Sequence, residues 1–214
     1  MSARHWVGWM AAMAIVAGAH AQPGQVPPVG PVAAAATPAA TPTVAPTVAP
    51  AATPAASPAA TPAARPVDVA TVDGIVAALY DVISGTAGQP LDWDRMRSLF
   101  APEGRLMAVG ARPEGVYALR AMTVEDYIAR NSKAFATMGF FEREAARSTE
   151  TFGQIVHVFS TYESRHARGD AEPFQRGINS IQLYHDGKRW WIVNLLWRAE
   201  DASLRLPERY LPRR

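Results

Sequence analysis

The sequence predicts one α+β domain in which helices come first and long antiparallel strands come last. Three observations support this class. From Val67 onward the composition becomes that of a globular protein, residues 71–138 carry helix patterns with capping residues, and residues 140–198 carry long β-favouring runs broken by glycine. Strands of this length twist and bend, so we expect helices to fill the concave side of a curved antiparallel sheet.

About three helices are expected. Thr71 can cap the first, which runs to about Ser84 with an apolar stripe at helical spacing. Asp92 can cap a shorter second helix. Thr123, followed three residues later by Asp126, is a capping-box-like start for a third helix that ends near residue 138.

The strands follow from runs of β-favouring residues. Two short strands, at 106–109 and 116–122, are expected between the second and third helices. Long strands are then expected at residues 140–149, 154–166, 174–185 and 188–198.

The last two strands form the most informative hairpin. Asp186-Gly187 can adopt the positive φ angles of a two-residue turn. Counting outward from that turn pairs Leu183 with Trp190, Ile181 with Ile192, and Asn179 with Asn194. Side chains alternate between faces, so these residues share one apolar surface that carries a single asparagine pair. We expect this surface to line a pocket.

The N-terminus has the features of an export signal. Arg4 is followed by a mostly apolar stretch at 7–18 and by Ala19-His20-Ala21, an A-x-A-like cleavage site. We therefore expect residues 1–21 to be a signal peptide and the protein to be periplasmic or secreted from a bacterium, with an uncleaved anchor as the alternative. The sequence contains no cysteine, which excludes disulfides and thiolate metal ligands.

Residues 22–66 are rich in proline, alanine and threonine. Proline recurs at every fourth position from Pro38 to Pro66, which favours extended polyproline II segments and disorder. We interpret this segment as a semi-rigid linker that reaches ~100 Å when extended. A docking motif for a proline-binding partner and a glycosylated stalk are the alternatives. The domain then spans residues 67–214.

Charge and motifs exclude several classes of function. The formal net charge is +2, and basic residues are not gathered on one predicted element, so we expect no nucleic-acid partner. The sequence shows no phosphate loop, dinucleotide fingerprint, nucleophile elbow or metal-binding histidine spacing. We therefore expect no cofactor and no metal, and no membrane insertion after signal cleavage.

The order of elements resembles the nuclear transport factor 2-like (SnoaL-like) superfamily. The segments that carry the resemblance are IVAALYDVIS, DWDRMRSLFAPEGRL, TVEDYIARNSKAF and DGKRWWIVNLLW, and it covers about residues 68–200. The resemblance implies a cone-shaped curved sheet wrapped on helices. Because the superfamily includes isomerases, dehydratases, polyketide cyclases and transport adaptors, it does not select a function.

Asn179 and Asn194 are the main candidates for ligand binding, together with Tyr127 and Trp190. An amide on an apolar face must find hydrogen-bond partners. The two asparagines either bond each other or a loop as a structural pair, or they contact a ligand.

His157 is a weak catalytic candidate. It lies in the middle of a predicted strand, on the same face as Glu163, but six residues of strand place the two side chains ~20 Å apart. A carboxylate partner would have to come from Glu142, Glu144 or Asp126.

The expected function is binding of a small apolar molecule or a partner without catalysis. The alternatives are an isomerase or dehydratase of the ketosteroid isomerase or polyketide cyclase type, and a structural dimerisation module. We expect a homodimer, because the second face of the hairpin is also apolar. That face carries Trp191, Val193, Leu195 and Trp197. Cover by the C-terminal tail is the alternative.

Overall fold

The computed structural model describes residues 61–212. The predicted signal peptide and the linker up to residue 60 lie outside the described residues. The helices are α1 (Pro66–Val69), α2 (Val72–Val82), α3 (Trp93–Leu99) and α4 (Val124–Thr137), with 3-10 turns η1 (Pro113–Gly115) and η2 (Glu208–Tyr210). The strands are β1 (Phe100–Ala111), β2 (Tyr117–Met122), β3 (Phe141–Phe152), β4 (Ile155–Arg165), β5 (Gln175–His185) and β6 (Trp190–Ala199).

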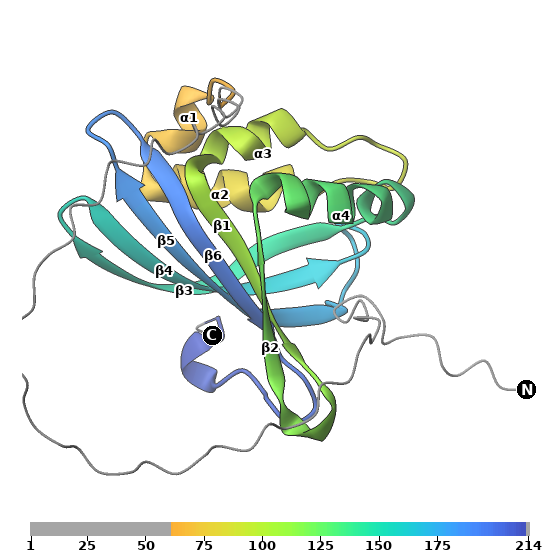
Figure 1. The fold of residues 1–214 in the computed structure, drawn as a ribbon. Helices are drawn as coiled ribbons and strands as arrows, with labels where there is room; N and C mark the ends of the chain where they lie inside the picture. Colours follow the sequence, from red (N-terminus) through yellow and green to blue (C-terminus); the bar gives the residue numbers. More distant parts are fainter. Residues whose placement is uncertain (1–60, 213–214) are drawn as a thin grey trace, which may run out of the picture. The chain divides into compact units, whose positions relative to one another are not determined.

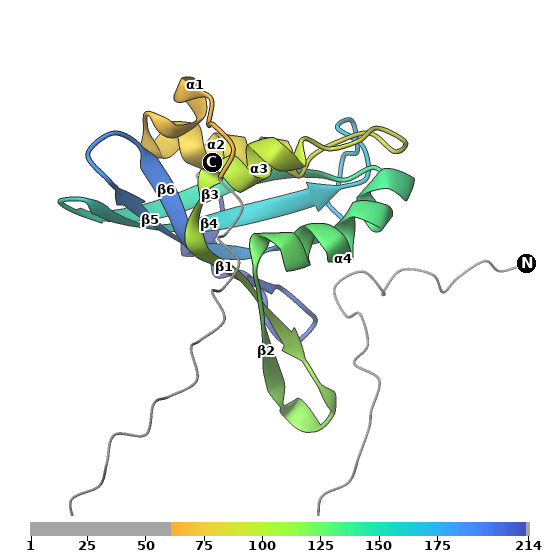
Figure 2. The ribbon, with the colours of Figure 1, turned by 45° about the horizontal axis from the view of Figure 1, so that its top comes forward.

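The strands form one six-stranded sheet in the order β2-β1-β6-β5-β4-β3. The sheet twists strongly, with α2 and α3 over one face, and the β1–β2 hairpin extends past the other strands (Figures 1 and 2). The α+β class is confirmed. The sheet is mixed rather than wholly antiparallel, because β1 pairs in parallel with β6.

The predicted helix starts are confirmed by their caps. The side chain of Thr71 accepts a hydrogen bond from the Gly74 backbone, and that of Asp92 accepts one from Arg95. Thr123 and Asp126 form a complete capping box at α4. Within residues 61–212, no helix combines the length and hydropathy that crossing a membrane requires.

The core lies between the helices and the helix-facing side of the sheet. Fully buried apolar side chains from α2 and α3, such as Ile75 and Met96, belong to one cluster with Val158, Ile181 and Ile192 of the central strands. Ala64, from the end of the predicted linker, also packs against this cluster.

The predicted register of the β5–β6 hairpin is wrong. The turn spans residues 186–189, because the Asp186 carboxylate accepts hydrogen bonds from the backbone of Lys188 and Arg189. Gly187 has a φ of +96°, as a turn glycine should. His185 consequently pairs with Trp190, two positions away from the expected alignment.

A bulge at Val193 shifts the pairing once more. Leu183 pairs with Ile192, whereas Gln182 pairs with Asn194, so Val193 is an extra residue in β6. Beyond the bulge, Leu195 and Trp197 face the helices, and Asn194 faces the other side of the sheet. Asn179 and Asn194 are therefore not cross-strand partners: Asn179 pairs with Trp197.

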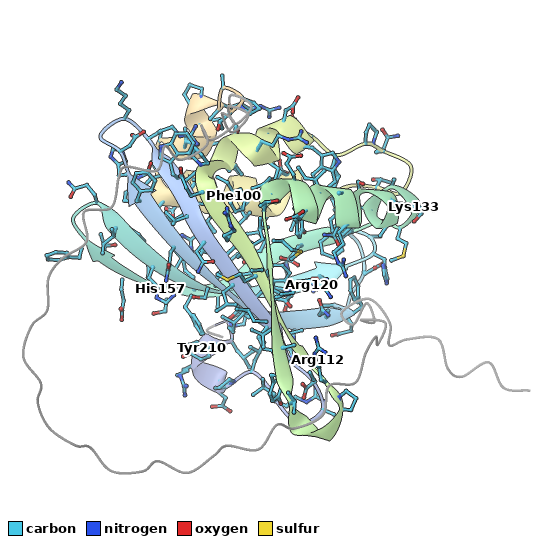
Figure 3. All side chains as sticks on the ribbon, viewed as in Figure 1. Phe100, Arg112, Arg120, Lys133, His157 and Tyr210 are labelled. Atoms are coloured by element: carbon cyan, nitrogen blue, oxygen red, sulfur yellow. The ribbon has the colours of Figure 1, made fainter. Side chains whose placement is uncertain are left out.

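The face of the sheet away from the helices is partly covered by the C-terminal segment. Thr161 donates a hydrogen bond of 2.5 Å to the Tyr210 carbonyl, and the rings of Phe159 and Tyr210 are 5.1 Å apart. Figure 3 shows His157 and Tyr210 on this side. The predicted second apolar face of the hairpin is smaller than expected, because the bulge turns Leu195 and Trp197 inward.

Candidate functional site

Glu142 is the centre of the candidate site. It lies near the start of β3 on the helix-facing side, opposite Ser164 of β4. Its backbone N–H donates to the Ser84 hydroxyl over 3.0 Å, which ties β3 to the residues just after α2. Ser164 is small, and the next helix-facing residue of β4 is the buried Tyr162, which lies opposite Gly177 of β5.

Two donors hold the carboxyl group of Glu142. The Ser164 hydroxyl donates to Oε2 over 2.8 Å, and the Asn179 amide donates to Oε1 over 3.3 Å. Burial disfavours the charged form and raises the pKa of Glu142 from 4.5 to about 7, while the two hydrogen bonds act in the opposite direction. Glu142 therefore exchanges its proton near neutral pH.

Asn179 connects Glu142 to a chain of hydroxyl groups. Its Nδ2 also donates to the Tyr80 hydroxyl over 3.1 Å, and the hydroxyl oxygens of Tyr80 and Ser160 are 2.7 Å apart. Ser160 donates over 2.5 Å to Glu144, so Tyr80 must donate to Ser160. All donors in the chain thus point from Asn179 toward Glu144.

Two further tyrosines lie within the electrostatic influence of Glu142. Tyr162 is 2% exposed, and its hydroxyl is buried without a hydrogen-bond partner among the described residues. Burial raises the pKa of both Tyr162 and Tyr127, and the charge of Glu142 raises each further. Both phenols therefore stay protonated and can act as hydrogen-bond donors.

The Glu142 pocket is an open hollow of about 290 Å³ beside this network. Its walls include Ser84, Phe141, Glu142, Arg143, Arg165 and Arg168. Glu142 and Phe141 both line the hollow, although alternation along β3 directs their side chains to opposite faces of the sheet. A second hollow, of about 420 Å³, lies between β2 and α4 and contains no buried acid among its lining residues.

Of the residues predicted to bind a ligand, only Asn179 joins the network. Asn194 is turned to the other face by the bulge, and its buried Oδ1 has no hydrogen-bond partner within residues 61–212. Tyr127 packs edge-on against Trp197, with ring centroids 6.3 Å apart. Trp190 packs against His185 at 5.0 Å. Ligand contacts of these residues stay predictions.

His157 is separated from the site by the sheet itself. Its Nε2 lies 2.9 Å from the Ser180 hydroxyl, and its ring packs against Phe159 on the face that the C-terminal segment partly covers. The sequence signal for the acid was the alternation in Phe-Glu-Arg-Glu, which places Glu142 and Glu144 on one face of β3. Their partners on other strands could not be identified without the register.

Comparison with known proteins yields similarities in structure alone. No family model matches the chain, and no curated protein matches it in sequence. A protein of unknown function from Silicibacter pomeroyi, described as NTF-2 like, is 22% identical over 61% of this chain and 94% of its own, with a TM-score of 0.41. A protein of unknown function with a cystatin-like fold from Nostoc punctiforme is 12% identical over 62% and 90%, with a TM-score of 0.46.

The name of a third similar structure includes an enzyme activity. It is the β subunit of a putative aromatic-ring-hydroxylating dioxygenase from Novosphingobium aromaticivorans, 16% identical over 66% of this chain and 94% of its own, with a TM-score of 0.44. The first of these three structures is described as NTF-2 like, which is the superfamily that the sequence segments resemble.

Proposed function

We propose that this domain binds a small polar molecule in the Glu142 pocket, with the carboxyl group of Glu142 as its main hydrogen-bonding group. The observation that carries the proposal is a half-buried glutamate that lines an open hollow and whose carboxyl group is held by Ser164 and Asn179. The expected apolar ligand is replaced here by a polar one, because charged side chains dominate the walls.

The energetics of Glu142 support a functional role. Burying a carboxyl group lowers the free energy of unfolding unless its hydrogen-bond partners compensate. Apolar side chains at this position would avoid that cost. The network that surrounds Glu142 draws on α2, β3, β4 and β5, so four separate elements contribute to placing one acid. Such convergence is typical of a prepared binding site.

A fragment screen by NMR on the full-length protein tests this proposal. Bound fragments are expected to shift the backbone amides of residues 84, 141–143 and 165–171. Glu142→Gln should change the affinity of the fragments that bind there, because a carboxamide has neither the charge of the ionised acid nor the hydroxyl group of the protonated acid. If fragments bind only between β2 and α4, or nowhere on residues 61–212, the proposal is wrong.

A second candidate function is proton transfer of the isomerase or dehydratase type. It is favoured by the pKa of Glu142, about 7, which suits a general acid or base at neutral pH. Carbonyl-containing fragments that bind the pocket should then exchange their α-hydrogens in D2O faster with the protein than with Glu142→Gln. Exchange at the buffer rate in both samples would exclude proton transfer and would leave binding as the only proposed function.

A further inference from the structure

The rim of the Glu142 pocket carries more positive than negative charge. Arg143, Arg165 and Arg168 line it together with Asp170, and Glu163 lies beside the first two arginines. Three cations against these two anions leave one net positive charge when Glu142 holds its proton. An uncompensated charge at the mouth of a hollow attracts a ligand of opposite sign.

The acids near the rim already have ion-pair or hydrogen-bond partners within the protein. Glu163 pairs with both Arg143, at 2.8 Å, and Arg165, at 3.0 Å. The Asp170 carboxylate accepts hydrogen bonds from the backbone of His166 and Ala167, at 3.1 and 2.9 Å. Neither carboxylate forms an ion pair with Arg168 within residues 61–212.

Arg168 and Arg165 differ in what they can offer. Arg168 is exposed, lies with its guanidinium 4.8 Å from the centre of the Phe141 ring, and forms no ion pair within residues 61–212. Arg165 is 8% exposed, and its Nη1, although 3.0 Å from Glu163, is not aligned for a hydrogen bond with it. The Arg168 guanidinium is thus without an ion pair at the rim, whereas the Arg165 guanidinium is fixed in the wall.

We propose that the Glu142 pocket selects small monocarboxylates, with the ligand carboxylate at Arg168 and its apolar part against Phe141. This inference rests on the proposed function and specifies its ligand class. A guanidinium donates two parallel hydrogen bonds to a carboxylate, and the Phe141 ring supplies an apolar wall nearby. A single net positive charge matches a monoanion better than a dianion such as phosphate.

Protonated Glu142 adds to the same preference. In that state it carries no charge, whereas the ionised group would repel an anion. Arg143 and Arg165 remain paired with Glu163, so the ligand does not have to break an existing ion pair. The free positive charge, the apolar wall and the acid therefore favour one kind of ligand.

The test compares benzoate with benzamide on the full-length protein by NMR titration. Benzoate should bind more tightly than the uncharged amide, with the largest shifts at residues 141–143 and 165–171. Arg168→Gln should weaken benzoate binding about tenfold and leave benzamide unchanged. The matched control is Arg112→Gln, which removes an exposed arginine from the end of β1 (Figure 3) and should leave both affinities unchanged.

Three results would overturn the inference. The first is equal affinity for benzamide and benzoate. The second is an equal loss of benzoate affinity in Arg168→Gln and Arg112→Gln. The third is no binding of either probe in the pocket. Each is separable from failure of the proposed function, since the wider fragment screen still shows whether uncharged molecules occupy the Glu142 pocket. Circular dichroism spectra of both variants should match the wild type, because both arginines are exposed.

Discussion

Asn179 on β5 donates a hydrogen bond to the carboxylate of Glu142 on β3, although β4 lies between these two strands. The helix-facing residues of β4 between them are Ser160, Tyr162 and Ser164, and Gly177 lies opposite Tyr162 on β5. Asn179 thereby positions Glu142 and links it to Tyr80.

Replacing Glu142 should change how stability depends on pH. The folded-state pKa of about 7 lies above the ordinary 4.5, so between these values the folded state binds more protons than the unfolded state. The free energy of unfolding should therefore fall as pH rises from about 4.5 to 7, by up to about 3 kcal/mol. Urea unfolding of Glu142→Gln should lack this slope. Glu150→Gln, an exposed change on the same strand, should keep it.

Asn179→Ala should act on both stability and proton binding. It removes a donor to Tyr80 and a donor to Glu142, which should lower the free energy of unfolding by about 2 kcal/mol. The pKa of Glu142 should rise further, because the lost hydrogen bond favours the charged form. NMR titration of the Glu142 carboxyl carbon measures this. Asn194→Ala is the control, and an equal rise there would contradict the assigned register.

Gly177 should not accept a side chain. A Cβ at this position would lie 2.4 Å from the Arg198 carbonyl oxygen and 2.7 Å from the Tyr162 hydroxyl. Gly177→Ala should therefore destabilise the domain by about 1–3 kcal/mol. Gly110→Ala is the matched change in β1, where no heavy atom lies within 4 Å of the new Cβ. Equal unfolding midpoints for the two variants would contradict the packing around Tyr162.

Arg95→Ala should lower the free energy of unfolding strongly, and Arg97→Ala should lower it only slightly. Arg95 bonds the buried Asp68 at 2.7 Å and lowers its pKa, whereas Arg97 pairs with acids that are mostly exposed. Loss of Arg95 leaves a buried charge unpaired, at about 3 kcal/mol, against less than about 1 kcal/mol for Arg97. The stabilisation from Asp68 is present above pH 3.8 and is lost as pH falls through its lowered pKa. The gap between wild type and Arg95→Ala should therefore shrink below pH 3.8 in denaturant titrations.

His157→Gln should leave ligand binding in the Glu142 pocket unchanged. The side chain contacts Ser180 and Phe159 on the opposite face of the sheet. Fragment affinities measured by NMR for the variant and the wild type should agree within error. A clear loss of affinity would place His157 in the functional site after all.

Much of the fold could be predicted from local patterns in the sequence. The caps at Thr71, Asp92 and Thr123 set the helix starts, and period-two alternation placed Gly177, Asn179, Ile181 and Leu183 on one buried face of β5. These features depend on residues close together in the chain, so composition and spacing are enough to predict them.

The register of β6 could not be predicted in the same way. The choice between a two-residue turn and the observed loop depends on where the Asp186 side chain bonds. The bulge at Val193 lies where the pairing of β6 with β1 also shifts, and β1 is far away in sequence. Both errors moved Asn194 away from the site. Glu142 gained its role from contacts with α2, β4 and β5, which lie far away in sequence. Export and self-association stay predictions.

The position of β6 has a consequence for how the domain is assembled. This strand follows all the others in sequence, yet it lies inside the sheet, between β1 and β5. Until it has emerged from the ribosome, β1 and β5 each present an open hydrogen-bonding edge to other chains. A chain truncated before Trp190 would carry two such edges at once, and we expect it to aggregate rather than to form a smaller stable domain.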